Sequence, residues 1–192
     1  LMHLGREAMG ADSVPVYALP RMHDYLKSNG PWSQLVSLGN INLKKIQPDS
    51  VVELNSRLRV AAIPVPHRDE FSETAAFLIQ GEKTALFIPD IDKWTRWEED
   101  IREWIKEVDY AFLDATFFDG DELPNRDMSE IPHPFVVESM QLFEPLEPKD
   151  RAKVTFIHFN HSTPLIFDGS HSNEVEMKGF KVARRMQVFP LE

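Results

Sequence analysis

Cysteine is absent from the 192 residues of this chain. Its absence excludes disulfide bonds, a thiolate nucleophile and any zinc site built from cysteine. If the chain binds a metal ion, histidine and carboxylate side chains must hold it. The compartment stays open, because a protein without cysteine folds in reducing and in oxidising surroundings. We expect a cytoplasmic protein, or a periplasmic or exported one if a signal peptide precedes Leu1.

Basic residues and long apolar runs are also scarce. Lysine and arginine number 21 against 31 aspartate and glutamate residues, which gives a formal net charge of −10. This charge opposes binding to the phosphate backbone of nucleic acids. No apolar run approaches the roughly 18 residues that a membrane-spanning helix needs. These absences favour a small-molecule or peptide substrate as the partner, and they leave the oligomeric state open.

The first ten residues resemble the interior of a helix, and position 1 is not methionine. No signal-peptide pattern of charged, apolar and small-residue regions is present either. We therefore expect residues upstream of Leu1 in the native protein. With 42% hydrophobic residues the chain can bury a core of its own, and its length predicts a single domain over residues 1–192.

Strand and helix patterns alternate along the chain, without a linker or an internal repeat. Alternating and β-branched runs predict strands, and apolar residues at helical spacing predict helices. The predicted strands are 14–18, 58–65, 74–79, 84–88, 109–113, 153–157 and 180–189, and 74–79 and 84–88 form a hairpin. The predicted helices are 20–28, 94–108 and 134–143. This order is typical of one α/β domain.

Metal-capable side chains follow four of the predicted strands. They are His67, Asp90, Asp114 and His158. Loops that leave strand ends often carry functional groups, and histidine with carboxylate suits zinc, iron or manganese. The pattern therefore predicts a metal site assembled from distant segments. Taken singly, each histidine also fits a surface or capping residue, and each aspartate fits a turn or a helix N-cap.

The strand 153–157 runs directly into two imidazoles, His158 and His161. The Ser-Thr-Pro that follows at 162–164 predicts the end of this segment. Two histidines at a strand end can bind a metal or transfer a proton. From the residues alone, both histidines remain candidates.

Five segments carry a resemblance to a known family. They are 4–10 (LGREAMG), 14–17 (VPVY), 29–35 (NGPWSQL), 113–117 (LDATF) and 156–164 (FIHFNHSTP). In their residues and in their order along the chain, they resemble the metallo-β-lactamase superfamily, particularly the relatives of pyrroloquinoline quinone biosynthesis protein B. The last segment is similar to that branch's strand-His-x-Asn-Asn-Thr-Asn-Pro signature. The resemblance spans nearly the whole chain and implies an α/β fold of the αββα sandwich type, incomplete at the N-terminus, and a bacterial source.

The resemblance also implies a role for each strand-end residue. His67 and His158 match metal ligands, and Asp90 matches the acid that bridges metals in the wider superfamily. Asp114 is similar to an acid that does not bind the metal itself but orients the residues that do, a role that tunes a metal site. His133 resembles a histidine beside the metals that handles substrate or protons in tRNA 3′-processing relatives.

Two departures from the family pattern are visible. The motif His-x-His-x-Asp-His does not occur in the 192 residues, and we expect it just before Leu1. His161 stands where the quinone branch has asparagine. Three interpretations of His161 stay open: an additional ligand, a substrate contact or a surface residue.

The function that this resemblance implies is metal-dependent hydrolysis. One or two zinc ions, or iron or manganese, would activate water for attack on an ester, amide or phosphodiester bond. Two alternatives remain. One is an iron-dependent hydroxylase related to pyrroloquinoline quinone biosynthesis, and the other is a degenerate, non-catalytic domain that binds a ligand or partner.

Overall fold

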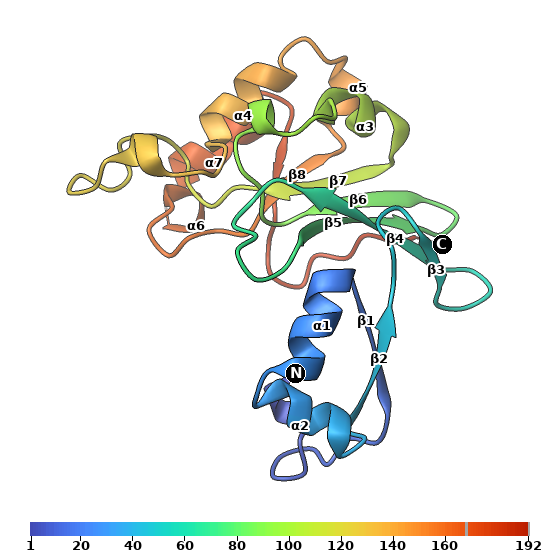
Figure 1. The fold of residues 1–192 in the computed structure, drawn as a ribbon. Helices are drawn as coiled ribbons and strands as arrows, with labels where there is room; N and C mark the ends of the chain where they lie inside the picture. The colour runs from blue at the N-terminus through green and yellow to red at the C-terminus, as the bar shows by residue number, and fades with distance from the viewer. Residues whose placement is uncertain (168, 192) are drawn as a thin grey trace.

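The computed structural model describes residues 1–167 and 169–191, and its main feature is a seven-stranded sheet (Figure 1). The strands occur in the sheet in chain order: β3 (Val51–Glu53), β4 (Arg59–Val65), β5 (Thr74–Gln80), β6 (Thr84–Ile88), β7 (Tyr110–Asp114), β8 (Val154–Ile157) and β9 (Lys181–Val182). Neighbours from β3 to β6 pair antiparallel, and neighbours from β6 to β9 pair parallel.

The parallel half of the sheet is connected by helices. The connection from β6 to β7 contains the 3₁₀ helix η2 (Trp94–Arg96) and α3 (Ile101–Glu107). The connection from β7 to β8 contains η3 (Met128–Glu130), α4 (Val136–Phe143) and α5 (Pro148–Arg151). The connection from β8 to β9 contains α6 (Pro164–Phe167) and α7 (Gly169–Met177). Parallel connections are almost always right-handed, so strands that follow in order receive their helices on one face. Figure 1 shows α3, α4, α5 and α7 together on that face. The expected α/β fold, a central sheet flanked by helices, is confirmed.

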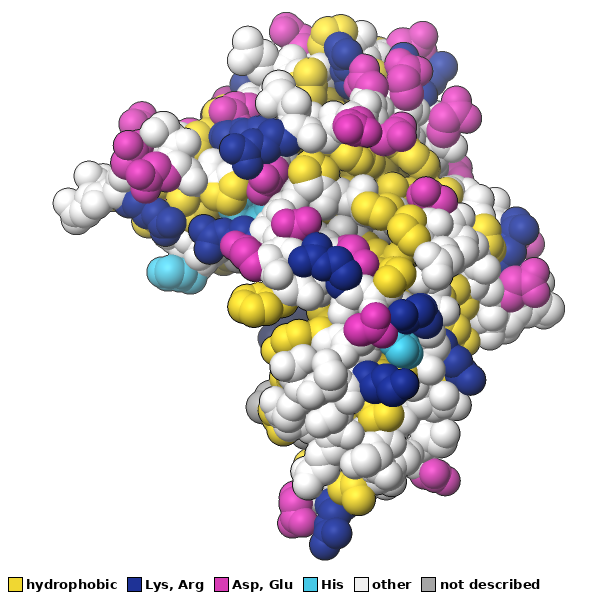
Figure 2. Space-filling view, viewed as in Figure 1, with side chains coloured by type: hydrophobic (Ala, Val, Ile, Leu, Met, Phe, Trp, Pro, Cys, Tyr) yellow, Lys and Arg dark blue, Asp and Glu magenta, His cyan; other side chains and the backbone are white. Residues whose placement is uncertain are grey.

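The hydrophobic core lies between this sheet face and the helices. Strand residues alternate between the two faces, so Leu86, Leu113 and Phe156 turn their side chains toward the helices and are fully buried. On α4, Met140 and Phe143 meet them from the helix side. The outer surface over α3 and α5, at the top of Figure 2, carries interspersed acidic and basic side chains, as a solvated layer should.

A smaller unit precedes the large sheet. After the 3₁₀ helix η1 (Met2–Leu4), β1 (Val14–Ala18) pairs in parallel with β2 (Ile41–Lys45), and α1 (Pro20–Ser28) and α2 (Trp32–Ser37) connect the two strands. In Figure 1 this unit projects on the side away from α3, α4 and α5. None of the helices in the described ranges is long and apolar enough to cross a membrane.

The smaller unit contacts the segment between β4 and β5, which carries His67. Arg21 donates through Nη2 to the carbonyl oxygens of Asp69 and Glu70. The Glu73 carboxylate accepts the backbone N–H of Arg21 at 2.9 Å and that of Met22 at 3.2 Å. These N–H groups lie in the first turn of α1 and have no partner within the helix, so an anion there is stabilising.

We expect Glu73→Gln to lower the free energy of unfolding at pH 7 by about 0.5–1 kcal/mol, since Glu73 is partly exposed. Burial acts to raise the pKa of Glu73, but the N–H donors of Arg21 and Met22 lower it below the usual 4.5. A lowered folded-state pKa stabilises the protein above about pH 4.5, and that stabilisation is lost as the pH falls through the folded value. Urea unfolding at pH 7 and pH 3 should therefore show a difference from wild type only at pH 7. An equal loss at both pH values would contradict the charge argument.

Most predicted elements agree with the structure, and three do not. The predicted helix 94–108 is wrong as one element. Asp100 accepts the N–H of Arg102 and caps α3, while Trp97 is extended between η2 and α3. The buried apolar stripe is kept without a continuous helix, because Trp94 reaches the core from a 3₁₀ turn and Trp97 from the extended residue after it.

The predicted strand 180–189 is also too long. Only Lys181 and Val182 pair with β8, after which the chain turns between Arg184 and Gln187. The first ten residues, expected as a helix interior, form the short η1 followed by turns. In those turns the N–H of Met9 donates to His3 and the N–H of Ala11 donates to Leu4. The sequence patterns missed β2, β3, α2 and the short helices α5 to α7, which are brief and weakly periodic.

Candidate metal centre

Four strands of the large sheet end at one edge. β4 and β6 both run antiparallel to β5, and β6, β7 and β8 are mutually parallel, so all four point the same way. Asp114 is the last residue of β7, and His67, Asp90 and His158 come just after β4, β6 and β8. A parallel arrangement collects such loops at the carboxyl edge of a sheet, and the structure places these side chains in two neighbouring groups there.

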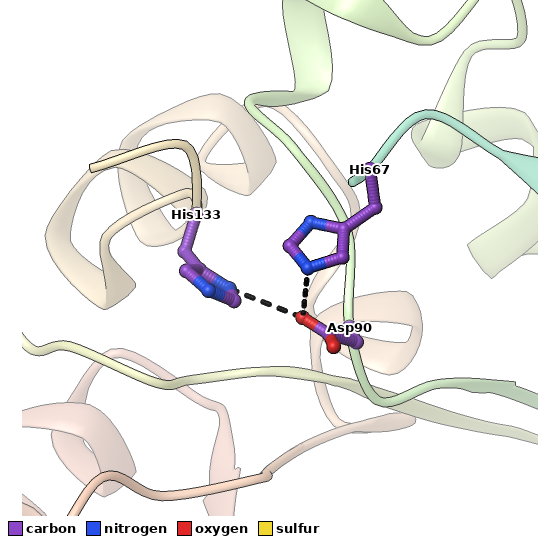
Figure 3. Close-up of side chains that lie close together, drawn as sticks. All are labelled: His67, Asp90 and His133. Carbon is purple, nitrogen blue, oxygen red and sulfur yellow. Dashed lines mark ion pairs between the residues drawn. The ribbon is translucent and has the colours of Figure 1, made fainter. Parts of the chain in front are cut away.

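The first candidate ligand group consists of His67, Asp90 and His133 (Figure 3). The Asp90 carboxylate oxygen Oδ1 lies 3.1 Å from Nε2 of His67 and 3.5 Å from Nδ1 of His133. The imidazole rings of the two histidines have centroids 5.1 Å apart. His133 comes from the loop before α4, so residues far apart in the sequence surround one carboxylate.

The second candidate group shares Asp90 and adds Asp114 and His158. One ligand atom from each residue lies within 4.8 Å of the others in both groups. The rings of His133 and His158 have centroids 6.3 Å apart, so the groups are adjacent. Asp90 is the member common to both groups.

Asp114 accepts a hydrogen bond from His133 and lies close to His158. It is fully buried at the end of β7, and its Oδ2 accepts from Nδ1 of His133 at 2.7 Å. Its Oδ1 accepts from the hydroxyl of Thr116 at 2.6 Å. Burial acts to raise the pKa of Asp114, but the hydrogen bonds of His133, His158 and Thr116, with the charge of His133, lower it to about 2. Asp114 is therefore an ionised acceptor at neutral pH.

Each imidazole of the cluster is held at Nδ1. His67 Nδ1 lies 3.1 Å from Asp92 Oδ1, and His133 Nδ1 bonds Asp114. His158 Nδ1 lies 3.0 Å from the Thr116 hydroxyl, which already donates to Asp114 and so accepts from His158. In the described ranges, Nε2 of each ring makes no hydrogen bond. Fixing one ring nitrogen in this way is how proteins orient the other toward a metal.

The Asp90 carboxylate supplies a test of whether a cation fits. Its Oδ1 is buried and has no hydrogen bond within residues 1–167 and 169–191, although Nε2 of His67 is 3.1 Å away. With the His67 proton on Nδ1, two lone pairs face each other, and only a cation or a second proton removes that repulsion. Two ligands on a tetrahedral zinc with bonds of about 2.0–2.1 Å lie about 3.3 Å apart. The residues thus fit a shared divalent ion.

His158 has an unusual backbone for a residue with a side chain. Its φ of 59° lies in the left-handed region, immediately after β8. Such a conformation costs on the order of 1 kcal/mol and is concentrated at functional sites. The hydrogen bond and charge of Asp114, followed by the charge of Asp90, raise the pKa of His158 against the opposing effect of its partial burial.

His161 lies apart from both groups. Its Nδ1 is 3.0 Å from the side-chain oxygen of Asn160, and its side chain is exposed. Sequence patterns singled out neither Asp92 nor Thr116, although both hold imidazoles. Asp92 is two residues beyond Asp90, and Thr116 is two residues beyond Asp114, so the i+2 spacing in each strand-end loop is the signal that could have revealed them.

Comparisons with known proteins identify the family and the fold. A family model described as a beta-lactamase superfamily domain matches residues 1–184. No curated protein matches the chain in sequence.

Three solved structures share the fold. Zinc-bound PqqB from Methylobacterium extorquens superposes with a TM-score of 0.72 at 19% identity over 90% of this chain and 63% of its own. A diphosphatase from the PhnP family gives 0.55 at 19% identity, covering 93% and 58%, and unliganded yeast PDE1 gives 0.54 at 11% identity, covering 89% and 57%. This chain thus spans less than two thirds of each. From the family match and the shared fold, the chain belongs to the metallo-β-lactamase superfamily.

Proposed function

We propose that the carboxyl edge of the large sheet binds a divalent metal ion, zinc in the first place, and that the protein is a metal-dependent hydrolase. His67, Asp90 and His158 are the proposed ligands, with Asp90 shared between two positions. The single observation that carries the proposal is the buried, unbonded Oδ1 of Asp90 facing Nε2 of His67. The resemblance to zinc-bound PqqB supports zinc.

The chain's own residues would orient the metal ligands and transfer a proton. A divalent ion at these residues would lower the pKa of water toward neutrality. Asp114 and Asp92 fix the rings of His133 and His67 through Nδ1. The ionised Asp114 stabilises positive charge on His133, so we assign His133 the donation of a proton from Nε2 to the leaving group.

The bond that is cleaved is proposed at the level of class. An ester, amide or phosphodiester fits a water nucleophile and a protonated imidazole. The fold shared with a diphosphatase of the PhnP family makes bonds to phosphorus, phosphodiesters included, the first class to assay. His161 has no part in this proposal, because it lies outside both ligand groups of the described chain.

Metal removal tests the proposal directly. We expect hydrolysis of bis(p-nitrophenyl) phosphate to fall to background after treatment with a chelator and to return when Zn²⁺ is added. The control is the same cycle with Ca²⁺, a hard ion that prefers an all-oxygen shell. Activity that survives complete removal of metal would overturn the proposal.

Two results would favour the alternatives. Iron in protein purified without added metal, together with oxygen uptake in the presence of a tyrosyl peptide, would favour the hydroxylase of the quinone branch. Protein that binds no zinc, iron or manganese at millimolar concentration would favour a non-catalytic binding domain.

A further inference from the structure

We propose that a pocket beside the candidate metal centre, lined by Arg184 and Arg185, binds the anionic group of a substrate that also has an apolar body. This inference rests on the proposed hydrolase function and specifies its substrate class. The two arginines follow β9, the last strand of the parallel half. They therefore lie at the same carboxyl edge as Asp90, Asp114 and His158.

The chain fixes the arginines next to His158. Ala183 donates its backbone N–H to the carbonyl of Phe156 on β8, at 3.0 Å. The following turn is closed by the N–H of Gln187, which donates to the Arg184 carbonyl, and by the Gln187 side chain, which accepts from the Arg184 N–H. Neighbouring strands lie about 4.8 Å apart, so the arginine backbone begins roughly one strand spacing from that of His158.

The pocket has a volume of about 650 Å³ and includes His158 in its wall. Its other walls are largely apolar, formed by Phe159, Leu165, Ile166 and Phe167. Phe167 is 75% exposed and Ile166 is 50% exposed. Large apolar side chains left in water beside a polar centre are typical of a ligand-binding wall.

Within residues 1–167 and 169–191, the two guanidinium groups lack a close ion pair. The nearest carboxylate to Arg184 is that of Glu176, with Nη2 and Oε1 4.0 Å apart, at the limit of an ion pair. Arg185 makes no ion pair or side-chain hydrogen bond within residues 1–167 and 169–191. The chain has a net charge of −10, and the two adjacent arginines bring local positive charge to this edge of the sheet. Guanidinium binds the paired oxygens of phosphate or carboxylate in a bidentate manner.

These features define the ligand. The anionic group contacts the arginines, an aromatic or aliphatic body lies against Phe167 and Ile166, and the far end of the molecule reaches His158. The substrate is thus an organic anion, not a neutral ester. Phosphate and carboxylate share the required chemistry, and the binding test separates them.

Binding is measured by calorimetry with the metal chelated, so the result does not depend on the metal centre. The probes are phenyl phosphate, benzoate and neutral benzyl alcohol. We expect wild type to bind at least one of the two anions, and to bind benzyl alcohol at least about 10-fold more weakly. The tighter anion identifies the recognised group.

The test variant is Arg184→Ala/Arg185→Ala, and the matched control is Lys44→Ala/Lys149→Ala, which removes the same charge from exposed positions outside the pocket. We expect the dissociation constant for the tighter anion to rise at least about 10-fold in the test variant and less than about 2-fold in the control. Circular dichroism confirms folding of both. Arg184→Lys/Arg185→Lys, which keeps the charge, should recover part of the loss.

The outcomes separate this inference from the proposed function. No anion binding by wild type, or equal binding by wild type and the test variant, would overturn the pocket even if metal-dependent hydrolysis is found. Arginine-dependent anion binding without any metal-dependent hydrolysis would support the pocket as a binding site and overturn the hydrolase.

Discussion

Asp90→Ala is expected to lower the affinity for Zn²⁺ by more than about 100-fold. Removing an outer partner of a metal ligand typically costs about 10–100-fold, and Asp90 is the shared member of both candidate ligand groups. Its loss also leaves Nε2 of His67 without the carboxylate 3.1 Å away. Competition with a chromogenic zinc chelator measures the affinity of the variant against wild type.

Two variants make the Asp90 result specific. Asp90→Asn keeps the shape but not the charge, and we expect an intermediate loss of zinc affinity. Asp121→Ala removes an exposed carboxylate outside both groups, so zinc affinity should stay within about 2-fold of wild type. The proposed site would be wrong if Asp90→Ala bound zinc as wild type does while retaining its circular dichroism spectrum.

Phe143→Ala is expected to lower the free energy of unfolding by about 3–5 kcal/mol, the usual cost of a large aromatic cavity. Phe143 is fully buried on α4, and its ring lies 6.0 Å from that of Trp94 and 6.3 Å from that of Phe180. It therefore joins the helices to the segment that leads into β9. A domain stability of about 5–15 kcal/mol would leave little margin after such a loss. Urea unfolding followed by tryptophan fluorescence measures it.

The control for Phe143 is another phenylalanine. Phe71 is 76% exposed and lies near Tyr25, with ring centroids 6.3 Å apart. We expect Phe71→Ala to cost less than about 1 kcal/mol, because little apolar surface returns to water. Similar losses for both variants would show that α4 does not form the core contact described.

Local patterns revealed the candidate site residues at the ends of strands. His67, Asp90, Asp114 and His158 each come directly after an apolar run, and strand signals of this kind depend on only a few neighbouring residues. His133 differs, because it lies in a loop before α4 and no periodicity marks it. Its candidacy came from the family resemblance alone, and the structure brings it within 2.7 Å of Asp114.

Local patterns were misleading where long-range contacts control the backbone. Residues 180–189 have strand character, yet only two of them pair, because the Gln187 side chain closes a turn onto Arg184. Because the prediction assigned these residues to a strand, it did not single out Arg184 and Arg185. The 94–108 run similarly has helical spacing, but the Asp100 cap begins a new helix within it.

The sequence by itself determined the chemistry: no thiolates, an acidic chain, and histidine and aspartate placed after strands. Those features are properties of composition and of short segments, so they can be derived without knowing the fold. Only the tertiary structure decided that Asp90 is shared by two candidate ligand groups, that Asp92, Asp114 and Thr116 hold the rings at Nδ1, and that the arginines after β9 lie beside His158. The reason is that strand order and direction, set by the packing of the whole core, choose which distant strand ends meet at one edge.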